Sequence, residues 1–182
     1  MNEAELVKQC LQGKHPAQKQ LYEHYAPKMF GVCYRYAQSR EEAEDFLQEA
    51  FITVFRKLQQ WKGEGELGAW IRRIVVNTSL NGIKARHRFT DNADAIAIEN
   101  FSGNNIHQPA NDHELVELIR QLPKGCQTVF NLYAIEGYSH DEIGNMLNIK
   151  ASTSRSQFMK ARAMLLKKIN PTTEIKTDKQ HG

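Results

Sequence analysis

Two acidic side chains, Asp45 and Glu49, stand four residues apart, so a helix through this stretch would place both carboxylates on one face. Gln48 lies beside that face and Ile52 lies on it. Two carboxylates could hold a metal ion, but no third ligand lies nearby in the sequence. An apolar side chain among acids and an amide suits a docking surface for a basic partner. The plainer alternative is a helix face that only meets water.

A second group of side chains combines aromatic rings with positive charge. Between Lys62 and Arg88 there are six Lys or Arg residues against two acids, a local net charge of +4. Such a surface attracts DNA phosphates, and an Asn beside a glycine-rich loop can read the edge of an unstacked base. The candidate DNA-binding residues are Trp61, Lys62, Arg73, Asn77, Lys84 and Arg88. The alternative is that the tryptophans belong to the core and the cations only add solubility.

A third group occupies positions 150–168, which hold six Lys or Arg residues and no acid. A helix with Ser and Arg near its amino terminus fits the major groove, where Arg pairs with guanine and hydroxyl groups reach bases or phosphates. The candidate residues are Ser152, Thr153, Arg155, Ser156, Met159 and Lys160. A basic amphipathic helix can also lie on anionic lipid or simply be solvated.

Signals for catalysis are absent from the sequence. The histidines show no metal-ligand spacing, and no phosphate-binding loop or nucleophile motif occurs. The three cysteines, at positions 10, 33 and 126, are too far apart for a metal pair. We therefore expect no catalytic residue, no metal and no cofactor, and a protein that is not an enzyme.

Helices must position all three groups, because the sequence carries apolar stripes at steps of three and four and no alternating strand pattern. The first stripe predicts a helix over residues 43–58, with Leu47, Ala50, Phe51, Val54, Phe55 and Leu58 facing the core. A second stripe at helical spacing predicts the next helix and consists of Trp70, Ile71, Ile74, Val75 and Thr78. The polar side of this helix would carry Arg73, Asn77 and Lys84. The fold class is therefore all-α.

The last part of the chain predicts a helix-turn-helix. A preceding helix is expected to contribute five side chains to the core of this domain, namely Val129, Phe130, Leu132, Tyr133 and Ile135. Ser139 and Glu142 form a capping-box pattern, and Asn148 can end that short helix in the left-handed conformation. A second helix starts almost at once, near Ala151, with Ser154, Phe158, Ala161 and Leu165 on its inner face.

Composition and charge bound the domain organisation. The 182 residues are 41% hydrophobic, enough for one or two small globular domains, and the net charge is only +3. We expect a first helical domain over 1–88, a flexible acidic linker over 89–112, a helix-turn-helix domain over 113–170 and a tail over 171–182. No apolar run could span a bilayer and the first residues do not resemble a signal peptide, so we expect a cytoplasmic protein without membrane insertion.

The order of these motifs resembles the extracytoplasmic-function sigma factors, the promoter-recognition subunits of bacterial RNA polymerase. Asp45, Gln48, Glu49, Ala50 and Phe51 match the family's D-x-x-Q-E-A-F, and Trp70, Arg73 and Asn77 match its W-[LI]-x-R-I-A-x-N. Thr153, Arg155 and Ser156 match in kind the family's upstream reader, G-T-V-K-S-R. Three positions depart from the pattern: Ser154 replaces a buried Val, Gln157 replaces an Arg, and Lys150 replaces a Ser or Pro.

The resemblance implies roles for these segments. The helix with Asp45 and Glu49 would dock on the clamp helices of core RNA polymerase, and residues 61–67 would capture a flipped base of the downstream promoter element. Asn77 is expected to contact a base, while the second helix of the pair reads the upstream element. The family often uses an anti-sigma factor as a further partner. The remaining alternative is a stand-alone transcriptional regulator or a helical adaptor protein.

Overall fold

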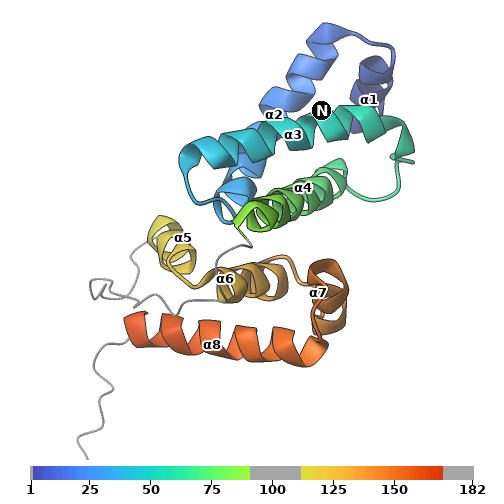
Figure 1. Ribbon diagram of the computed structural model, residues 1–182. Coiled ribbons are helices and arrows are strands. Elements are labelled where there is room, and N and C mark those ends of the chain that lie inside the picture. The colour runs from blue at the N-terminus through green and yellow to red at the C-terminus, as the bar shows by residue number, and fades with distance from the viewer. Residues whose placement is uncertain (1, 91–111, 170–182) are drawn as a thin grey trace, which may run out of the picture. The chain divides into compact units, whose positions relative to one another are not determined.

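The computed structural model describes residues 2–90 and 112–169, with side chains described except at 86–90 and 112. Every element in these two ranges is helical, and no strand occurs in them (Figure 1). The expected all-α class with two helical domains is therefore confirmed. Most of the predicted linker and the predicted tail lie outside the described residues. No helix among the described residues is both long and apolar enough to cross a membrane.

The first unit contains α1 (Glu3–Leu11), α2 (His15–Tyr34), α3 (Arg40–Lys57), the 3-10 turn η1 (Leu58–Gln60) and α4 (Leu67–Thr90). Helices α2, α3 and α4 pack against one another, and α1 packs against α2 (Figure 1). The core side chains come from all four helices, among them Leu6, Leu21, Val54, Leu67 and Ile71. Helix α4 extends two residues beyond the expected end of the first domain.

The α3 stripe lies in the core as the sequence predicts. Leu47, Ala50, Phe51, Val54 and Leu58 are buried, and Phe55 is half-buried. The hydroxyl oxygen of Ser39 accepts a hydrogen bond from the backbone N–H of Glu42 at 3.2 Å, which caps the first turn of the helix. Cap and stripe together fix which face of α3 meets solvent.

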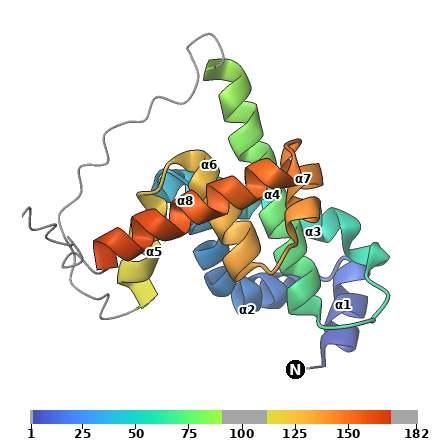
Figure 2. The same cartoon turned by 90° about the horizontal axis from the view of Figure 1, so that it is seen from below.

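The second unit contains α5 (Asp112–Arg120), α6 (Lys124–Phe130), the π-helical turn η2 (Asn131–Ile135), α7 (His140–Leu147) and α8 (Ala151–Ile169). Helix α8 runs alongside α6, and α7 packs against the end where α8 begins (Figures 1 and 2). The core of the second unit includes Leu118, Ile119, Leu122, Cys126, Ala161 and Leu165.

One expectation for this core is wrong. Tyr133 is 39% exposed, although Leu132 beside it is fully buried. The backbone N–H of Glu136 donates to the carbonyl of Asn131 at 2.9 Å, an i to i+5 bond that widens the helix locally. This wider turn shifts the residues that face inward, so the 3.6-residue pattern no longer holds for Tyr133. Its ring instead stacks on His140, with centroids 4.2 Å apart.

The helix-turn-helix is present and is built as the sequence predicts. Ser139 and Glu142 form a complete capping box, and Asn148 adopts the left-handed conformation with φ 56° and ψ 47°. A Cβ atom on Gly144 would lie 2.8 Å from the carbonyl oxygen of Ile149, so the turn passes too close to α7 for a larger side chain. Helix α8 starts directly after this turn.

Candidate functional site

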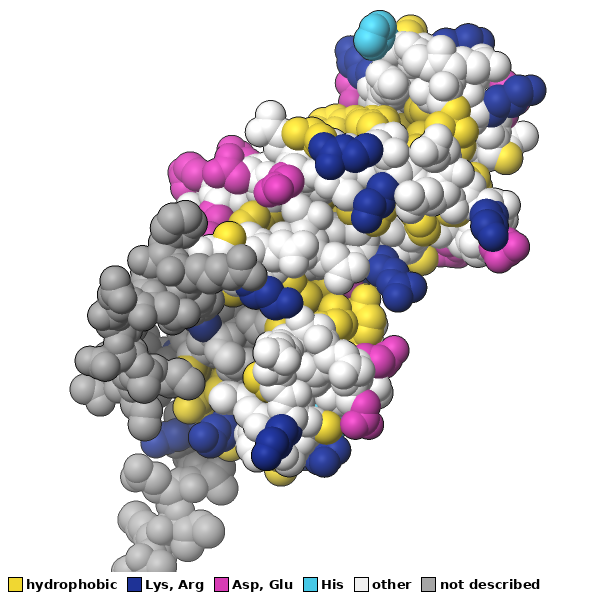
Figure 3. Space-filling model, turned by 45° about the vertical axis from the view of Figure 1, so that its right-hand side comes forward, with side chains coloured by type: hydrophobic (Ala, Val, Ile, Leu, Met, Phe, Trp, Pro, Cys, Tyr) yellow, Lys and Arg dark blue, Asp and Glu magenta, His cyan; other side chains and the backbone are white. Residues whose placement is uncertain are grey.

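The acidic side of α3 is open to solvent. Asp45, Gln48, Glu49 and Ile52 are all exposed, and we refer to these four residues as the α3 face. Ile52 is 53% exposed and lies among polar and acidic side chains. Figure 3 shows acidic side chains gathered at one end of the first unit. The four side chains are therefore available to a partner, and none of them is needed to fill the core.

Tyr22 on α2 is an exposed aromatic side chain next to α3 that the sequence analysis did not identify. The ring is 41% exposed and meets the edge of Phe51, the buried neighbour of Ile52, with centroids 4.7 Å apart. Only the packing of α2 on α3 brings Tyr22 to this position. Nothing in the local pattern of α2 marks it.

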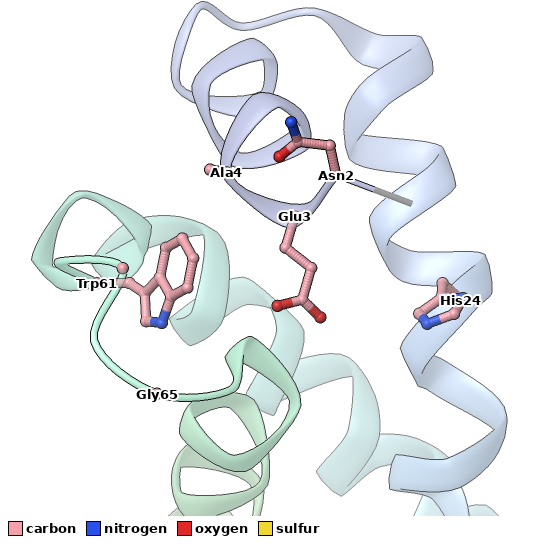
Figure 4. A pocket seen from close by; sticks show the side chains of 7 residues that line it. Asn2, Glu3, Ala4, His24, Trp61 and Gly65 are labelled. Atoms are coloured by element: carbon pink, nitrogen blue, oxygen red, sulfur yellow. The ribbon is translucent and has the colours of Figure 1, made fainter.

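The loop between η1 and α4 forms one wall of an open pocket of about 550 Å³. Trp61 is half-buried and lines the pocket together with Gly63, Gly65, Glu3 and other residues of the first unit (Figure 4). Both glycines have positive φ angles, +78° and +75°, which other residues rarely adopt. The indole Nε1 of Trp61 is buried without a hydrogen-bond partner. Trp61 is thus neither a core residue nor a fully exposed one.

Helix α4 separates its polar and apolar sides as the sequence predicts. Arg73 and Asn77 are exposed and Lys84 is half-buried, whereas Ile71 and Val75 are fully buried. Lys62 in the preceding loop is also exposed. The backbone of Arg88 lies in α4, and its side chain is outside the described part of the chain.

In the second unit the six candidate residues of α8 all face solvent. Ser152, Thr153, Arg155, Ser156, Met159 and Lys160 are exposed, and Met159 reaches 58% exposure. Ser154, Ala161 and Leu165, on the other side of the helix, are buried. The helix therefore presents a small, polar and basic outer face that the fold itself does not use.

Side-chain contacts explain two of the three departures from the family pattern. Ser154 is fully buried, and its hydroxyl lies 2.9 Å from Nδ1 of His140, so a polar contact replaces the usual apolar side chain. The amide oxygen of Gln157 accepts from the thiol of Cys126 at 2.9 Å, which turns this side chain toward α6. Lys150 is exposed immediately before α8 begins.

One cation of the basic segment is not part of its surface. Lys168 is buried, and its amino group donates to the side-chain oxygen of Gln121. Burial lowers the pKa of Lys168 because the charged form loses its hydration. Lys168, one of the six cations in the segment 150–168, therefore does not belong to the exposed basic surface of α8.

The described residues offer no metal-binding group of three His, Cys, Asp or Glu side chains. All three cysteines are buried and free. Burial raises the pKa of the Cys126 thiol, partly offset by the nearby charge of Lys160, which disfavours the reactive thiolate.

Two family models match the chain, one in each unit. Residues 21–89 match sigma-70 region 2, and residues 112–165 match sigma-70 region 4. The first match includes α3 and nearly all of α4, and the second includes the helix-turn-helix. A stand-alone regulator with only a helix-turn-helix would not require the first match.

Curated relatives are similar over almost the whole chain. The ECF RNA polymerase sigma-E factor of Haemophilus influenzae is 32% identical over 179 residues, which cover 91% of this chain and 94% of that protein. The RNA polymerase sigma-H factor of Pseudomonas aeruginosa is 29% identical, with 92% and 93% covered. A solved structure of the sigma factor RpoE with the anti-sigma factor NepR from Bartonella quintana has the same fold, with a TM-score of 0.52, 18% identity and 82% and 94% coverage. From these matches and the two helical units, we conclude that the chain belongs to the ECF sigma factors of RNA polymerase, which act in transcription initiation.

Proposed function

We propose that this sigma factor binds core RNA polymerase through the α3 face and holds promoter DNA with both of its units. In the first unit Trp61, Lys62, Arg73, Asn77, Lys84 and Arg88 would bind the downstream element. In the second unit Ser152, Thr153, Arg155, Ser156, Met159 and Lys160 would bind the upstream element. The protein would act in the cytosol, by binding alone and without catalysis.

The outer face of α8 carries this proposal most directly. A helix that buries Ser154, Ala161 and Leu165 leaves six polar, basic or flexible side chains without a role in the fold. The tight turn after α7 leads directly into α8, whose amino-terminal end packs on α7 through its inner side and leaves its outer face exposed, where it can enter a major groove. Arg155 can then pair with a guanine, while the serines and Thr153 bond to bases or phosphates.

The first unit supports a different kind of DNA contact. Its open pocket lies beside a loop rather than on a rigid helix face, and Trp61 offers a ring on which a base can stack. Arg73 and Asn77 are exposed one helical turn apart on α4. An unstacked strand suits this surface better than an intact duplex, which would explain how binding promotes melting.

The α3 face is acidic, in contrast to the basic DNA-binding surfaces, and its negative charge suits a basic surface of the polymerase. Asp45 and Glu49 would guide association, and Ile52 would supply apolar contact at the centre. We further propose that an anti-sigma factor regulates this protein, since the structurally similar RpoE was solved in complex with one.

The direct test is a footprint of the holoenzyme on a promoter that wild-type holoenzyme has selected from a random DNA library. We expect protection of the upstream element and permanganate-reactive, unstacked thymines at the downstream element. The Asn77→Ala variant should keep the upstream protection and lose most of the reactivity, whereas Lys19→Ala, on an unrelated surface of α2, should match the wild type. A selection that enriches no DNA sequence would contradict the proposed function.

A further inference from the structure

Glu3, in the first turn of α1, connects three segments that are far apart in the sequence. One carboxylate oxygen accepts a hydrogen bond from the hydroxyl of Tyr25 on α2 at 2.5 Å. The other accepts from the backbone N–H of Leu67, the first residue of α4, at 3.4 Å. This N–H has no partner within its own helix, and a negative charge is favourable at a helix amino terminus. Glu3 therefore caps α4 from another helix.

Tyr25 completes this connection. It is 5% exposed, and a Cβ atom added to Gly68 would lie 3.1 Å from its ring, so the ring fits closely under the first turn of α4. Loss of hydration and the hydrogen bond to Glu3 both raise the pKa of Tyr25, which keeps the hydroxyl protonated as a donor. The ring and the carboxylate thus hold the same turn of α4 from two sides.

The start of α4 is also the end of the loop that lines the pocket. Residues 61–66 run from η1 to Leu67, and Glu3 lines the pocket together with Trp61, as Figure 4 shows. Atoms added at Gly63 or Gly65 would meet nothing within 4 Å, so little packing restrains the middle of the loop. Its geometry depends on its two ends, and Glu3 fixes one of them.

We propose that Glu3 is a positioning residue for DNA recognition, holding residues 61–66 through Tyr25 and the first turn of α4 in the shape that receives an unstacked promoter base. This inference rests on the proposed function of the pocket. It assigns α1 a role in DNA binding, although α1 precedes the region 2 match, which starts at residue 21. Neither Glu3 nor Tyr25 would touch DNA in this arrangement.

The test compares variants of the full chain assembled with core RNA polymerase on a selected promoter that carries 2-aminopurine at the downstream element. Tyr25→Phe, which removes one hydrogen bond to a charged group, should lower the extent of base unstacking by about tenfold or more, and Glu3→Ala, which removes both hydrogen bonds, should lower it by at least as much. The double variant should be no worse than Glu3→Ala alone, because that change already removes both hydrogen bonds. Glu3→Gln, which keeps one acceptor and the shape, should lie between Glu3→Ala and the wild type.

Two further measurements separate positioning from a general role in folding. Affinity for core polymerase should change less than twofold in every variant, because the α3 face is on a different helix. Glu5→Ala is the matched control, since Glu5 is exposed on α1 and, among the described residues, its side chain accepts a hydrogen bond from Gln9 alone. It should behave like the wild type in both measurements.

Three results would overturn the inference. Unstacking equal to the wild type in both Glu3→Ala and Tyr25→Phe would show that the loop does not need this connection. An equal loss of unstacking and of polymerase affinity would show that Glu3 only supports the fold. If Glu3→Ala does not fold, Tyr25→Phe decides, because it keeps the ring and removes only the hydroxyl. A wild-type holoenzyme that unstacks no base would instead refute the proposed function itself, and this inference with it.

Discussion

The exposed side chains of α8 differ in what each can contribute to DNA recognition. Arg155 carries a planar group with several donors, which can bond to two acceptors of one guanine, whereas Lys160 offers a point charge suited to phosphate. Ser152 and Ser156 are short, and the hydroxyl of Ser156 already donates to the carbonyl of Ser152 at 3.1 Å. Sequence discrimination should therefore depend mainly on Arg155.

Replacing Arg155 with Ala should weaken binding to the selected promoter by about 1–3 kcal/mol and relax discrimination at one upstream base pair. The measurement is equilibrium binding of the holoenzyme to promoters with single base-pair changes. Lys160→Ala, the matched control, should weaken binding to all of these promoters by the same factor. An equal loss on every promoter for Arg155→Ala would contradict the base-reading role.

For single residues, exposure could be predicted from the sequence, whereas contacts with distant parts of the chain could not. The exposure of Asp45, Ile52 and Arg155 followed from helical periodicity, because the period alone fixes which side faces the core. The contacts of Glu3 with Leu67 and of Gln157 with Cys126 could not be predicted. These contacts join residues that are 64 and 31 positions apart in the sequence. They depend on how the helices pack, and local sequence patterns carry no information about that packing.

At the scale of elements, the predicted helices with a strong local signal are the ones that the structure reproduces. Helix α3 has a continuous apolar stripe, and α7 has a complete capping box. The π-helical turn η2 has neither, and its wider turn places Tyr133 outside the core. Helix α2 continues through Pro27 even though proline disfavours a helix interior, because packing of its other residues compensates.

The acidic side of α3 gives a prediction about a whole helix face. Charge reversal at both Asp45 and Glu49, to Arg, should abolish association with core polymerase on size-exclusion chromatography while the thermal unfolding midpoint stays close to that of the wild type. Neither side chain contributes to the core, so the fold has no need of their charge. Glu23→Arg on the exposed side of α2 is the control and should still associate. A double variant that unfolds would instead assign these acids to the stability of α3.

Contact between α3 and α4 gives a prediction about packing. A Cβ atom on Gly82 would overlap the ring of Phe46, so Gly82→Ala should lower the free energy of unfolding by about 1–3 kcal/mol. Gly31→Ala on α2 is a matched control, because a Cβ atom at Gly31 would meet nothing within 4 Å. This substitution should stabilise the helix by about 0.5–1 kcal/mol. Urea unfolding followed by tryptophan fluorescence reports on this unit, which holds both Trp61 and Trp70. Equal stability of the two variants would mean that α3 and α4 are not in close contact at Gly82.

For the molecule as a whole, we propose that each of the two small units binds its own element of the promoter. Each DNA contact alone is modest, but once one unit is bound the other finds its element at a high effective concentration. The boundaries predicted from the acidic segment 89–112 remain a prediction, because that segment lies almost entirely outside the described residues. The proposed roles in polymerase binding and DNA binding rest on three separate exposed surfaces, those of α3, α4 and α8.

Run-off transcription with purified core RNA polymerase tests the central claim most directly. On a promoter selected by the holoenzyme, the chain should be required for a transcript with one defined start, and the Asp45→Arg, Glu49→Arg double variant should give none. Core polymerase that produces the same transcript without the chain, or a holoenzyme that starts at no selected promoter, would contradict the account.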